Sequence, residues 1–337
     1  MPRIVITDYE FESISQEQAV ADSNGVELVR AHCRTEDDVL KAAAEADGLI
    51  VQYAPITERV LQNLPRLKAV SRYGVGVDTI DVEAATECGV AVSNVPDYGV
   101  EDVSDHAIAL ALTLARGIPD LDRGVRAGRN LLESVKPLRR FSSQTFGVVG
   151  LGLIGAATAA KAKALGFRPL GYDPLHTPGT TTKEGIEVVS FDDLLAASDV
   201  VSLHVPLNKH THHLINARTL EQFKEGATIV NTCRGGVIDT EALIDALKIG
   251  RIRAAGLDVF EEEPLPLNSA LLDLERVVLT PHTAWYTEES NDELKRRTAE
   301  NVVDACLGRR PRNIVNPEVL NQSLPEPGGA GRPTVKA

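Results

Sequence analysis

The sequence has few aromatic residues, few cysteines and no long hydrophobic run. Phe, Trp and Tyr make up only 4% of the 337 residues, so a core must be built from Val, Leu, Ile and Ala. The longest apolar run, 107–115, is interrupted by Thr113 and falls far short of the roughly 20 residues that a membrane-spanning helix needs. The N-terminus lacks the charged and then apolar segments of a secretory signal. We therefore expect a cytoplasmic protein that does not enter a membrane.

Cysteine usage argues against two further classes of protein. The cysteines form no CxxC pair, and their spacing indicates neither a disulfide framework nor a zinc site; they are Cys33, Cys88, Cys233 and Cys306. We expect free thiols in a reducing cytoplasm, and no bound metal.

The chain also lacks an excess of positive charge. Its formal net charge is −13 at pH 7, which argues against direct binding of nucleic acid because phosphate binding needs a basic surface. Apolar residues at 43% and charged residues at 25% are ordinary for a globular protein. A length of 337 residues allows about two domains, each long enough to bury its own core.

Short β-branched runs alternate with helical stretches along the first hundred residues. This alternation, with short connections, predicts a mostly parallel sheet covered by helices on both faces. The predicted strands are Arg3–Thr7, Val26–Ala31, Gly48–Gln52, Leu67–Ser71 and Val90–Asn94, and the predicted helices are Ser15–Asp22, Glu36–Glu45, Thr57–Asn63 and Asp81–Glu87.

A second alternating series follows, after a largely apolar helix at Val103–Ile118 that must be buried between domains or between subunits. Glu288–Leu307 forms a last helix, and the polar residues from Pro317 on predict a loosely attached tail. The second series has predicted strands at Phe146–Gly150, Arg168–Tyr172, Val200–His204, Thr228–Asn231, Ala255–Val259 and Val277–Thr280, and predicted helices at Leu153–Leu165, Asp192–Ala197 and Thr240–Ile249.

A glycine motif at residues 150–155 follows an apolar strand and opens a helix, the context in which G-x-G-x-x-G indicates a dinucleotide site. Gly150 permits the tight turn, Gly152 lets the backbone approach the pyrophosphate, and Gly155 lets the helix pack on the strand. The next strand ends in Asp173, which can bind ribose hydroxyls and repel a 2′-phosphate, so NAD is favoured over NADP. The ordinary alternative is a glycine turn that only aids packing. The motif alone does not separate dehydrogenases from flavin or S-adenosylmethionine enzymes.

Three later segments each place a polar residue just past a predicted strand, so Arg234, Glu263 and His282 can converge on one cleft. The planar guanidinium of an arginine can grip the carboxylate and carbonyl of a 2-oxo acid. His282 can protonate the alkoxide that forms on hydride transfer, and Glu263 can orient the ring and stabilise its charged form. Taken alone, an arginine, glutamate or histidine in such a loop is more often an ordinary surface or structural residue. Of the three consecutive glutamates at 261–263, we expect two to be surface residues. The order of Arg234, Glu263 and His282 after strands of a dinucleotide fold favours catalysis.

The combination resembles the D-isomer-specific 2-hydroxyacid dehydrogenases over nearly the whole chain up to Pro317. The resemblance implies that Arg234 binds substrate, Glu263 is the partner acid and His282 is the acid/base. Other predicted cofactor contacts are Leu153, Ile154, His204, Pro206, Thr232, Cys233 and Asp258, of which the last three line the nicotinamide pocket. The predicted substrate loop, whose backbone amides would hold a carboxylate as an anion nest, consists of Arg72, Tyr73, Gly74, Val75 and Gly76.

The resemblance also implies an architecture of two Rossmann- or flavodoxin-like doubly wound domains, with the cofactor domain inserted into the substrate domain. The expected substrate domain is 1–101 with 285–317, the NAD-binding domain is 102–284, and 318–337 is a flexible tail. We expect a homodimer built on the helix Val103–Ile118.

Within the family, the likeness is greatest to the C-terminal-binding proteins, on residues that include Arg72, Asn94 and the His282–Tyr286 segment. Trp285 would then wall the substrate pocket, unless it serves packing in the core or at a dimer interface. Phosphoglycerate dehydrogenases remain possible, although no regulatory domain follows residue 337, so we do not expect the long serine-regulated form. The sequence thus predicts a 2-oxo acid reductase, with an NAD(H)-sensing corepressor-like binding protein as the alternative. The substrate could also be 3-phosphoglycerate or an unusual acid such as a phosphonate.

Overall fold

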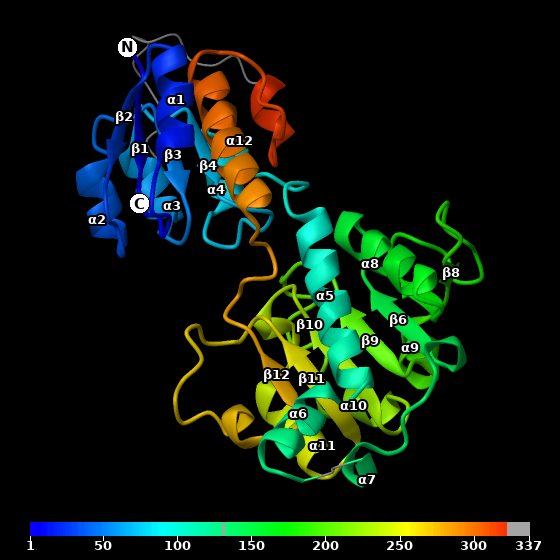
Figure 1. Ribbon diagram of the computed structural model, residues 1–337. Coiled ribbons are helices and arrows are strands. Elements are labelled where there is room, and N and C mark those ends of the chain that lie inside the picture. The colour runs from blue at the N-terminus through cyan, green and yellow to red at the C-terminus, as the bar shows by residue number, and fades with distance from the viewer. Residues whose placement is uncertain (130–131, 322–337) are drawn as a thin grey trace. The chain divides into compact units, whose positions relative to one another are not determined.

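The computed structural model describes residues 1–129 and 132–321, and Figure 1 shows its helices and strands. The chain forms two compact units. Unit 1 comprises residues 1–98 together with the segment from residue 288 on, and unit 2 comprises residues 99–287. Unit 2 is therefore inserted into unit 1 along the chain, and each unit is built around its own parallel sheet.

The sheet of unit 1 has five parallel strands in the order β2-β1-β3-β4-β5. This is a doubly wound order of the flavodoxin type. Its strands are β1 (Arg3–Ile6), β2 (Glu27–Arg30), β3 (Gly48–Val51), β4 (Ala69–Arg72) and β5 (Ala91–Ser93). Its helices are α1 (Ser15–Ser23), α2 (Glu36–Ala42), α3 (Glu58–Asn63), α4 (Val82–Glu87), α12 (Glu288–Cys306) and the 3-10 helix η4 (Pro317–Asn321).

Helices cover both faces of this sheet. On one face, buried side chains of α2, α3 and α4 such as Val39, Leu61 and Ala85 join the strand residues in one apolar core. On the other face α12 packs directly over the strands, because a Cβ on Gly48 would stand only 2.7 Å from Cys306 Sγ and Val302 Cγ2. The glycine at the start of β3 thus sets how close α12 can lie to the sheet.

The sheet of unit 2 has seven parallel strands in the order β12-β11-β10-β9-β6-β7-β8. Its strands are β6 (Thr145–Val149), β7 (Arg168–Tyr172), β8 (Glu187–Val188), β9 (Val200–Leu203), β10 (Ala227–Asn231), β11 (Ile252–Leu257) and β12 (Val277–Leu279). Its α-helices are α5 (Val100–Ala115), α6 (Ile118–Arg126), α7 (Leu132–Val135), α8 (Leu153–Ala164), α9 (Phe191–Ala197), α10 (Ala217–Gln222) and α11 (Thr240–Lys248), and η1 (Phe141–Ser143), η2 (Gly235–Val237) and η3 (Ala270–Asp273) are 3-10 helices.

Two apolar cores hold this second sheet, one on each face. Ala107 and Ala111 of α5 and Ala159 of α8 pack with Phe146 and Val148 on one side. Buried leucines and isoleucines of α9, α10 and α11 form the core on the other side. Small residues on α5 and α8 let these two helices lie close together over the strands. The predicted fold class of two doubly wound α/β sheets is confirmed.

The structure differs from the expected elements in a few places. The helix expected at Val103–Ile118 is α5, which begins at Val100 and ends at Ala115, because Gly117 has a left-handed φ of 63° and separates it from α6. The strand expected from Ala255 begins at Ile252. Helices α6, α7 and α10 and strand β8 have no predicted counterpart.

The tail expected at 318–337 begins in an ordered segment. Residues 317–321 form η4, and Val319 is buried with an exposure of only 1%. The remaining residues, 322–337, lie outside the described part of the chain. The loosely attached tail predicted from Pro317 on is therefore wrong for its first five residues.

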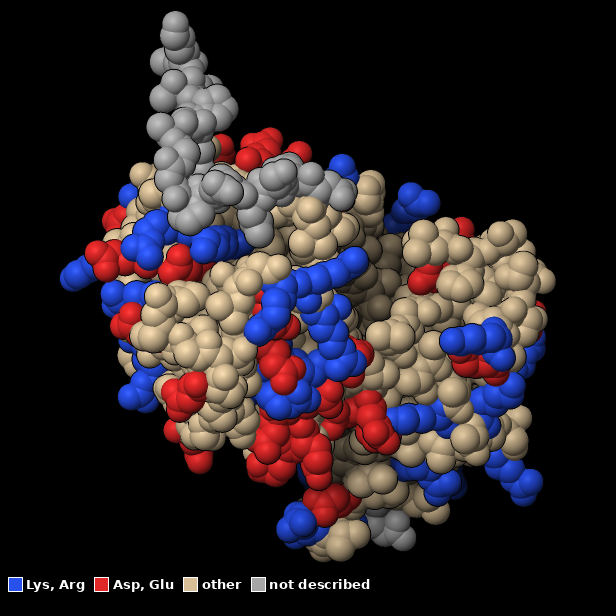
Figure 2. Space-filling view, turned by 90° about the horizontal axis from the view of Figure 1, so that it is seen from above, with Lys and Arg blue, Asp and Glu red and all other residues tan. Residues whose placement is uncertain are grey.

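Charged side chains of both signs are interspersed on the face that Figure 2 shows. Exposed ion pairs such as those of Arg59 with Glu36 and Asp37 are individually worth little, so the fold depends on its apolar cores. All four cysteines are free thiols, and burial raises the pKa of Cys33 to about 11 and that of Cys306 to about 12. Among the described residues, no helix combines the length and the apolar character that crossing a membrane requires.

Candidate active site

The three catalytic candidates follow three neighbouring strands of unit 2. Arg234 follows β10, Glu263 follows β11, and His282 follows β12. These strands are parallel and adjacent, so their carboxyl ends lie at one edge of the sheet, where ligands of α/β proteins bind. The structure thus brings the three predicted segments to the same edge.

His282 and Glu263 are in direct contact, with His282 Nδ1 2.7 Å from Glu263 Oε2. Their side chains are 31% and 34% exposed, so the pair is accessible to a small molecule. Because Nδ1 faces the carboxylate, Nε2 is the ring nitrogen left to meet a substrate. His282 also has a left-handed backbone with φ of 53°, a conformation that is uncommon for a non-glycine residue and is concentrated at functional sites.

The surroundings keep Glu263 ionised. Burial by itself raises the pKa of Glu263, but the hydrogen bond and charge of His282, helped by the Phe260 amide and the charge of Arg234, bring the pKa below its usual value. Phe260 N donates to Glu263 Oε1 at 2.9 Å. Glu263 is therefore a carboxylate at neutral pH and can stabilise a protonated imidazole beside it.

Asp258, which is fully buried, holds the loop that carries His282. Its carboxylate accepts hydrogen bonds from Thr280 Oγ1 at 2.6 Å and from the amides of Thr283 and Ala284 at 2.9 Å each. Its main-chain carbonyl accepts from His282 N at 2.7 Å. Asp258 was predicted only as a cofactor contact, and this positioning role was not predicted. A buried acid at the end of an apolar strand was the available signal, because such a group needs several donors.

Asn231, which was not among the predicted site residues, shapes the turn that presents Arg234. Its Nδ2 donates to Arg234 O at 2.9 Å, and its Oδ1 accepts from Cys233 N at 3.1 Å. A Cβ on Gly235 would stand 1.8 Å from the carbonyl carbon of Phe260. The residue after Arg234 must therefore be glycine for the turn to pack against the segment that leads to Glu263.

The glycine loop at 150–155 meets the steric conditions for a bound dinucleotide. It joins β6 to α8 at the point where the strand order reverses, between β6 and β9, which is the ligand crevice of doubly wound sheets. A Cβ on Gly150, whose φ is 94°, would stand 2.4 Å from His204 O, and one on Gly155 would stand 1.9 Å from Gly150 O. A Cβ on Gly152 would meet nothing within 4 Å, so a pyrophosphate can approach the backbone there.

Two predicted cofactor residues flank this loop. Asp173 follows β7, and its carboxylate accepts from Leu151 N at 2.9 Å and Leu175 N at 2.8 Å. A carboxylate has further lone pairs, so these bonds leave acceptor capacity for ribose hydroxyls. His204 follows β9, with Nε2 2.8 Å from Ser202 Oγ, and burial lowers its pKa to about 3. His204 is thus neutral at physiological pH and adds no charge to the crevice.

The remaining predicted cofactor residues lie at the same edge of the sheet. Leu153 and Ile154 open α8, with the Leu153 side chain 60% exposed, and Pro206 follows β9 on the surface. Thr232 is buried beside Cys233, and its hydroxyl has no hydrogen-bond partner among the described residues. A buried hydroxyl without a partner is unfavourable, and a polar group of a bound cofactor could supply the partner.

The predicted substrate loop belongs to unit 1, where it follows β4. Tyr73 is almost fully buried, and its amide donates to Val51 O at 2.9 Å. Gly74 has a φ of 122°, and a Cβ there would stand 2.0 Å from Arg72 Nη1. The loop therefore turns over the Arg72 side chain in a conformation that favours glycine.

Two carbonyls of this loop are bound by the segment that follows β5. Val95 N donates to Gly74 O at 2.9 Å, and Asn94 Nδ2 donates to Val75 O at 2.6 Å. Because a trans peptide is planar, with its C=O and N–H pointing in opposite directions, the amides of Val75 and Gly76 both point away from this segment. Neither amide donates a recorded hydrogen bond within the described chain, so the pair can bind an anion.

Trp285 lies half-buried after the His282 loop, edge-on to Tyr286 with ring centroids 5.5 Å apart. Tyr286 is 48% exposed. These contacts do not test whether the indole meets a substrate, and its place in the pocket wall stays a prediction.

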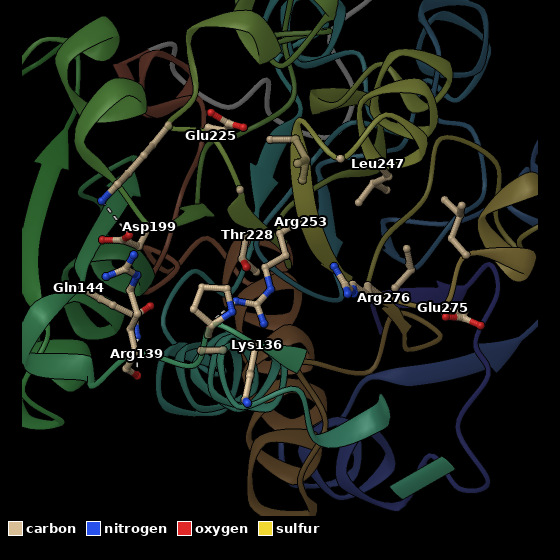
Figure 3. Close-up of a pocket in the computed structure, with 18 of the residues that line it drawn as sticks. Lys136, Arg139, Gln144, Asp199, Glu225, Thr228, Leu247, Arg253, Glu275 and Arg276 are labelled. Atoms are coloured by element: carbon tan, nitrogen blue, oxygen red, sulfur yellow. Dashed lines mark hydrogen bonds and ion pairs between the residues drawn. The ribbon is translucent and has the colours of Figure 1, made fainter. Parts of the chain in front are cut away.

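A cavity of about 930 Å³ lies elsewhere in unit 2, and Figure 3 shows the residues that line it. Its lining includes Gln144, Asp199 and Arg276, which immediately precede β6, β9 and β12. It is therefore at the amino ends of the strands, opposite to the edge that carries Arg234, Glu263 and His282. Lys224 forms an ion pair with Asp199 at 2.7 Å, and Arg253 donates hydrogen bonds to main-chain carbonyls. Both cations therefore already have partners within the protein. None of the predicted site residues lines this cavity.

The chain is similar to known proteins along most of its length. The family model for the NAD-binding domain of D-isomer specific 2-hydroxyacid dehydrogenases matches residues 108–284. Glyoxylate reductase of Thermococcus litoralis is 40% identical over 294 residues, which are 85% of this chain and 88% of that protein. D-3-phosphoglycerate dehydrogenase of Mycobacterium leprae is 39% identical over 327 residues, which are 96% of this chain but 61% of that protein.

Solved structures show the same fold. D-lactate dehydrogenase of Aquifex aeolicus, complexed with NAD and lactic acid, superposes with a TM-score of 0.81 at 30% sequence identity. The match covers 93% of this chain and 99% of that one.

Proposed function

Since the chain belongs to the D-isomer specific 2-hydroxyacid dehydrogenase family, we propose that Arg234, Glu263 and His282 carry out its hydride-transfer reaction on a small 2-oxo acid. The enzyme is an NAD-dependent oxidoreductase acting on CH–OH groups. The 2.7 Å contact between His282 Nδ1 and Glu263 Oε2 is the observation that supports this assignment most directly. A histidine held in this way, at the carboxyl edge of a dinucleotide-binding sheet, suits general acid–base catalysis.

The cofactor site fits NAD. Gly150, Gly152 and Gly155 would hold the pyrophosphate at the N-terminus of α8, Asp173 would bind the adenosine ribose, and Thr232 would face the nicotinamide carboxamide. When bound, NADH supplies the hydride for the carbonyl carbon of the substrate. The other predicted contacts, Leu153, Ile154, His204, Pro206, Cys233 and Asp258, would line the same crevice.

The chain's own residues handle the substrate and its proton. Arg234 binds the carboxylate and the carbonyl oxygen with its planar guanidinium, and the amides of Val75 and Gly76 offer further donors for the carboxylate. His282 holds a proton at Nε2 and donates it to the carbonyl oxygen in reduction. In oxidation, His282 takes the proton from the hydroxyl group. Glu263 keeps Nδ1 protonated and stabilises the charged ring.

We assign cofactor binding and the three catalytic residues to the predicted domain 102–284, and the loop with further donors for a carboxylate to the predicted domain 1–101 with 285–317. These bounds differ by three residues at each crossing from the compact units 99–287 and 1–98 with 288 on. Glyoxylate reduction and 3-phosphoglycerate oxidation are the reactions named for the two curated relatives, and both substrates carry the carboxylate that this site is built to bind. A cytoplasmic location suits a soluble-substrate reaction that uses free NAD.

We also propose that the enzyme is a homodimer. Helix α5, which the sequence analysis assigned to the dimer contact, is largely buried within its own unit. Apolar side chains on the following helices are exposed instead, with Ile118 at 51%, Val125 at 76% and Leu132 at 47%. This group of side chains on α6 and α7 would be covered by a second copy of the chain.

The test of the function is NADH oxidation with a panel of 2-oxo acids: glyoxylate, hydroxypyruvate and a longer apolar acid. We expect at least one to be reduced, and a simple aldehyde without a carboxylate to be a poor substrate because Arg234 would have no anion to bind. The Arg234→Lys variant, which keeps the charge but loses the bidentate geometry, is expected to raise the KM. Failure of the wild-type protein to oxidise NADH with any 2-oxo acid would favour an NAD(H)-dependent binding protein.

A further inference from the structure

Helix α12 of unit 1 carries polar side chains where a packed helix normally carries apolar ones. Lys295, Arg297 and Asn301 are each only 2% exposed. Removing charged groups from water is costly unless they are paired and hydrogen-bonded. These three side chains therefore need polar partners within unit 1.

Lys295 reaches the substrate loop through a buried carboxylate. Its Nζ lies 3.9 Å from Glu17 Oε2 and donates to Ser13 O. The other oxygen of Glu17 accepts a hydrogen bond from the Tyr73 hydroxyl at 2.7 Å. Tyr73, the second residue of the loop, is 3% exposed. Lys295 and Glu17 thus hold Tyr73, near the start of the loop, in place.

Glu17 has few other partners. It is 0% exposed, and its Oε2 accepts no hydrogen bond among the described residues, which leaves Lys295 as the cation that faces it. Burial raises the pKa of Glu17, against the opposing effects of Tyr73 and Lys295. The position of Tyr73 therefore depends on a small set of buried groups from α1 and α12.

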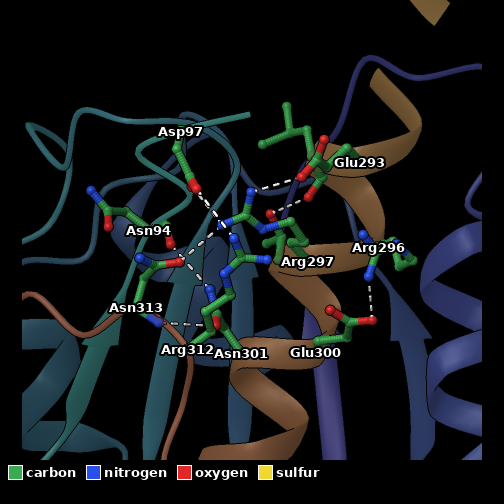
Figure 4. Close-up of polar contacts among 11 residues, drawn as sticks. Asn94, Asp97, Glu293, Arg296, Arg297, Glu300, Asn301, Arg312 and Asn313 are labelled. Atoms are coloured by element: carbon green, nitrogen blue, oxygen red, sulfur yellow. Dashed lines mark hydrogen bonds and ion pairs between the residues drawn. The ribbon is translucent and has the colours of Figure 1, made fainter. Parts of the chain in front are cut away.

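Asn301 and Arg297 contact Asn94 and Asp97 of the segment 94–97, as Figure 4 shows. Asn301 Nδ2 donates to Asn94 O at 3.0 Å, and Asn94 in turn holds Val75 O. Arg297 forms an ion pair with Asp97 and another with Glu293, the latter at 2.8 Å. These contacts hold the segment 94–97 in place. The segment in turn holds the carbonyls of Gly74 and Val75, and the orientation of these two peptide groups sets the direction of the Val75 and Gly76 amides.

We propose that the buried polar residues Lys295, Arg297 and Asn301 of α12, with Glu17 of α1, are positioning residues that aim the amides of the loop 72–76 at the substrate carboxylate. The proposal rests on the proposed function for its consequence in catalysis, and on the contacts within unit 1 for the positioning itself. These residues touch no reacting atom; they act through Tyr73 and Asn94.

The experiment compares Lys295→Met and Asn301→Ala with a control on the same helix, Arg296→Ala. Arg296 is about half exposed and pairs with Glu300, so its loss leaves the buried network intact. The first readout is amide hydrogen exchange of peptides that contain Tyr73 and Val95, whose amides donate to Val51 O and Gly74 O. We expect exchange to be faster by about tenfold or more in the two test variants and unchanged in the control.

The second readout is steady-state kinetics with the best 2-oxo acid of the panel. We expect KM for the acid to rise about tenfold or more, with kcat and the NADH dissociation constant changed by less than about threefold, because binding of the carboxylate is what the loop supplies. Lys295→Arg should restore much of the affinity. If these residues were purely structural, the variants would have a lower melting temperature, but KM would not rise selectively while kcat stayed nearly constant.

The outcomes separate the two proposals. Unchanged exchange at Tyr73 and Val95 in both test variants, or unchanged KM with an active wild type, overturns the positioning role. Faster exchange in a protein that reduces no 2-oxo acid keeps the positioning role and rejects the proposed function. Should Lys295→Met not fold, Tyr73→Phe removes only the hydroxyl that binds Glu17 and is expected to give the same direction of change in KM.

Discussion

At the scale of single residues, the proposed chemistry depends on how His282 is held. Glu263 binds one ring nitrogen at 2.7 Å. Asp258 accepts hydrogen bonds from the Thr280 hydroxyl before the histidine and from the main-chain amides of Thr283 and Ala284 after it. The left-handed backbone of His282 is stabilised by these surrounding bonds, since such a conformation is unfavourable for a side chain with a Cβ. The ring is therefore oriented before a substrate arrives.

The His282–Glu263 pair predicts a particular response to mutation. His282→Ala should lower kcat by about 10²- to 10⁴-fold, the usual contribution of a general acid–base group, while NADH binding stays nearly unchanged. The measurement is steady-state kinetics together with fluorescence titration of NADH. Turnover close to wild type in His282→Ala would exclude the proposed mechanism.

The pair also predicts a pH dependence. The pKa of Glu263 lies below its usual value, so the group is a carboxylate at neutral pH, and in the proposed mechanism it stabilises the charged ring that donates the proton in reduction. Glu263→Gln removes that charge, and reduction should then decline at a lower pH than in the wild type. Rates across roughly pH 5–9 in both directions check this. Superimposable pH profiles for the two proteins would show that Glu263 does not influence the proton.

Asp173 predicts the choice of cofactor. Its carboxylate stands beside the glycine loop and should repel a 2′-phosphate. Asp173→Ala should narrow the preference for NAD over NADP by at least about tenfold, which corresponds to roughly 1.4 kcal/mol. The comparison needs kcat/KM for NADH and NADPH in both proteins, and a wild type that prefers NADPH would contradict the assignment.

At the scale of elements, the functional groups come from the loops that follow strands, while helices hold those loops in place. The same division occurs in both units. In unit 2 the glycine loop leads into α8, and the loops that carry Arg234, Glu263 and His282 follow β10, β11 and β12. In unit 1 the substrate loop follows β4, and its contacts lead back to α1 and α12.

The contact between α1 and α12 predicts a pH-dependent stability. Burial raises the pKa of Glu17 in the folded state, so folding favours its protonated form. The stabilisation from this group is present below the ordinary pKa of a glutamate and is lost as the pH rises through the raised value. The groups that face Glu17 are Tyr73 and Lys295.

Glu17→Gln tests that linkage, because the amide keeps an acceptor for Tyr73 but cannot ionise. The melting temperature of the variant, relative to wild type, should be more favourable at neutral pH than in mild acid. Thermal unfolding of both proteins across that range is the measurement. A constant difference at every pH would show that Glu17 does not titrate differently in the folded and unfolded states.

At the scale of the whole molecule, the chain consists of two units, with residues 99–287 inserted into the other. The exposed apolar residues of α6 and α7 are the part of unit 2 that a second copy would cover. Sedimentation of the wild type should give about twice the chain mass of 36.3 kDa. Val125→Glu places a charge among these side chains and should shift the mass toward that of one chain, whereas a wild type that sediments as one chain would contradict the homodimer.

Several elements followed directly from the sequence. The alternation of β-branched runs with helical stretches predicted the parallel strands, because it reflects the burial of each strand on both faces. The short elements α7, α10 and β8 were not predicted, since a four-residue helix or a two-residue strand has too few residues for its periodicity to be seen. Elements of this size are stabilised by what they pack against.

The sequence by itself determined the glycine loop, Asp173 and the order of the three catalytic segments, because these depend on local steric requirements and on the ends of strands. No local feature distinguishes the three consecutive glutamates, and only the resemblance to a known family pointed to Glu263. The tertiary structure shows the physical difference between them: Glu261 binds His213 and the Thr240 amide, Glu262 is exposed, and Glu263 contacts the ring of His282. It also decided that Lys295 and Asn301 contact Glu17 and Asn94, the residues that bind the predicted substrate loop. Such contacts join residues more than 200 positions apart in the sequence, and no local pattern encodes the packing that brings them together.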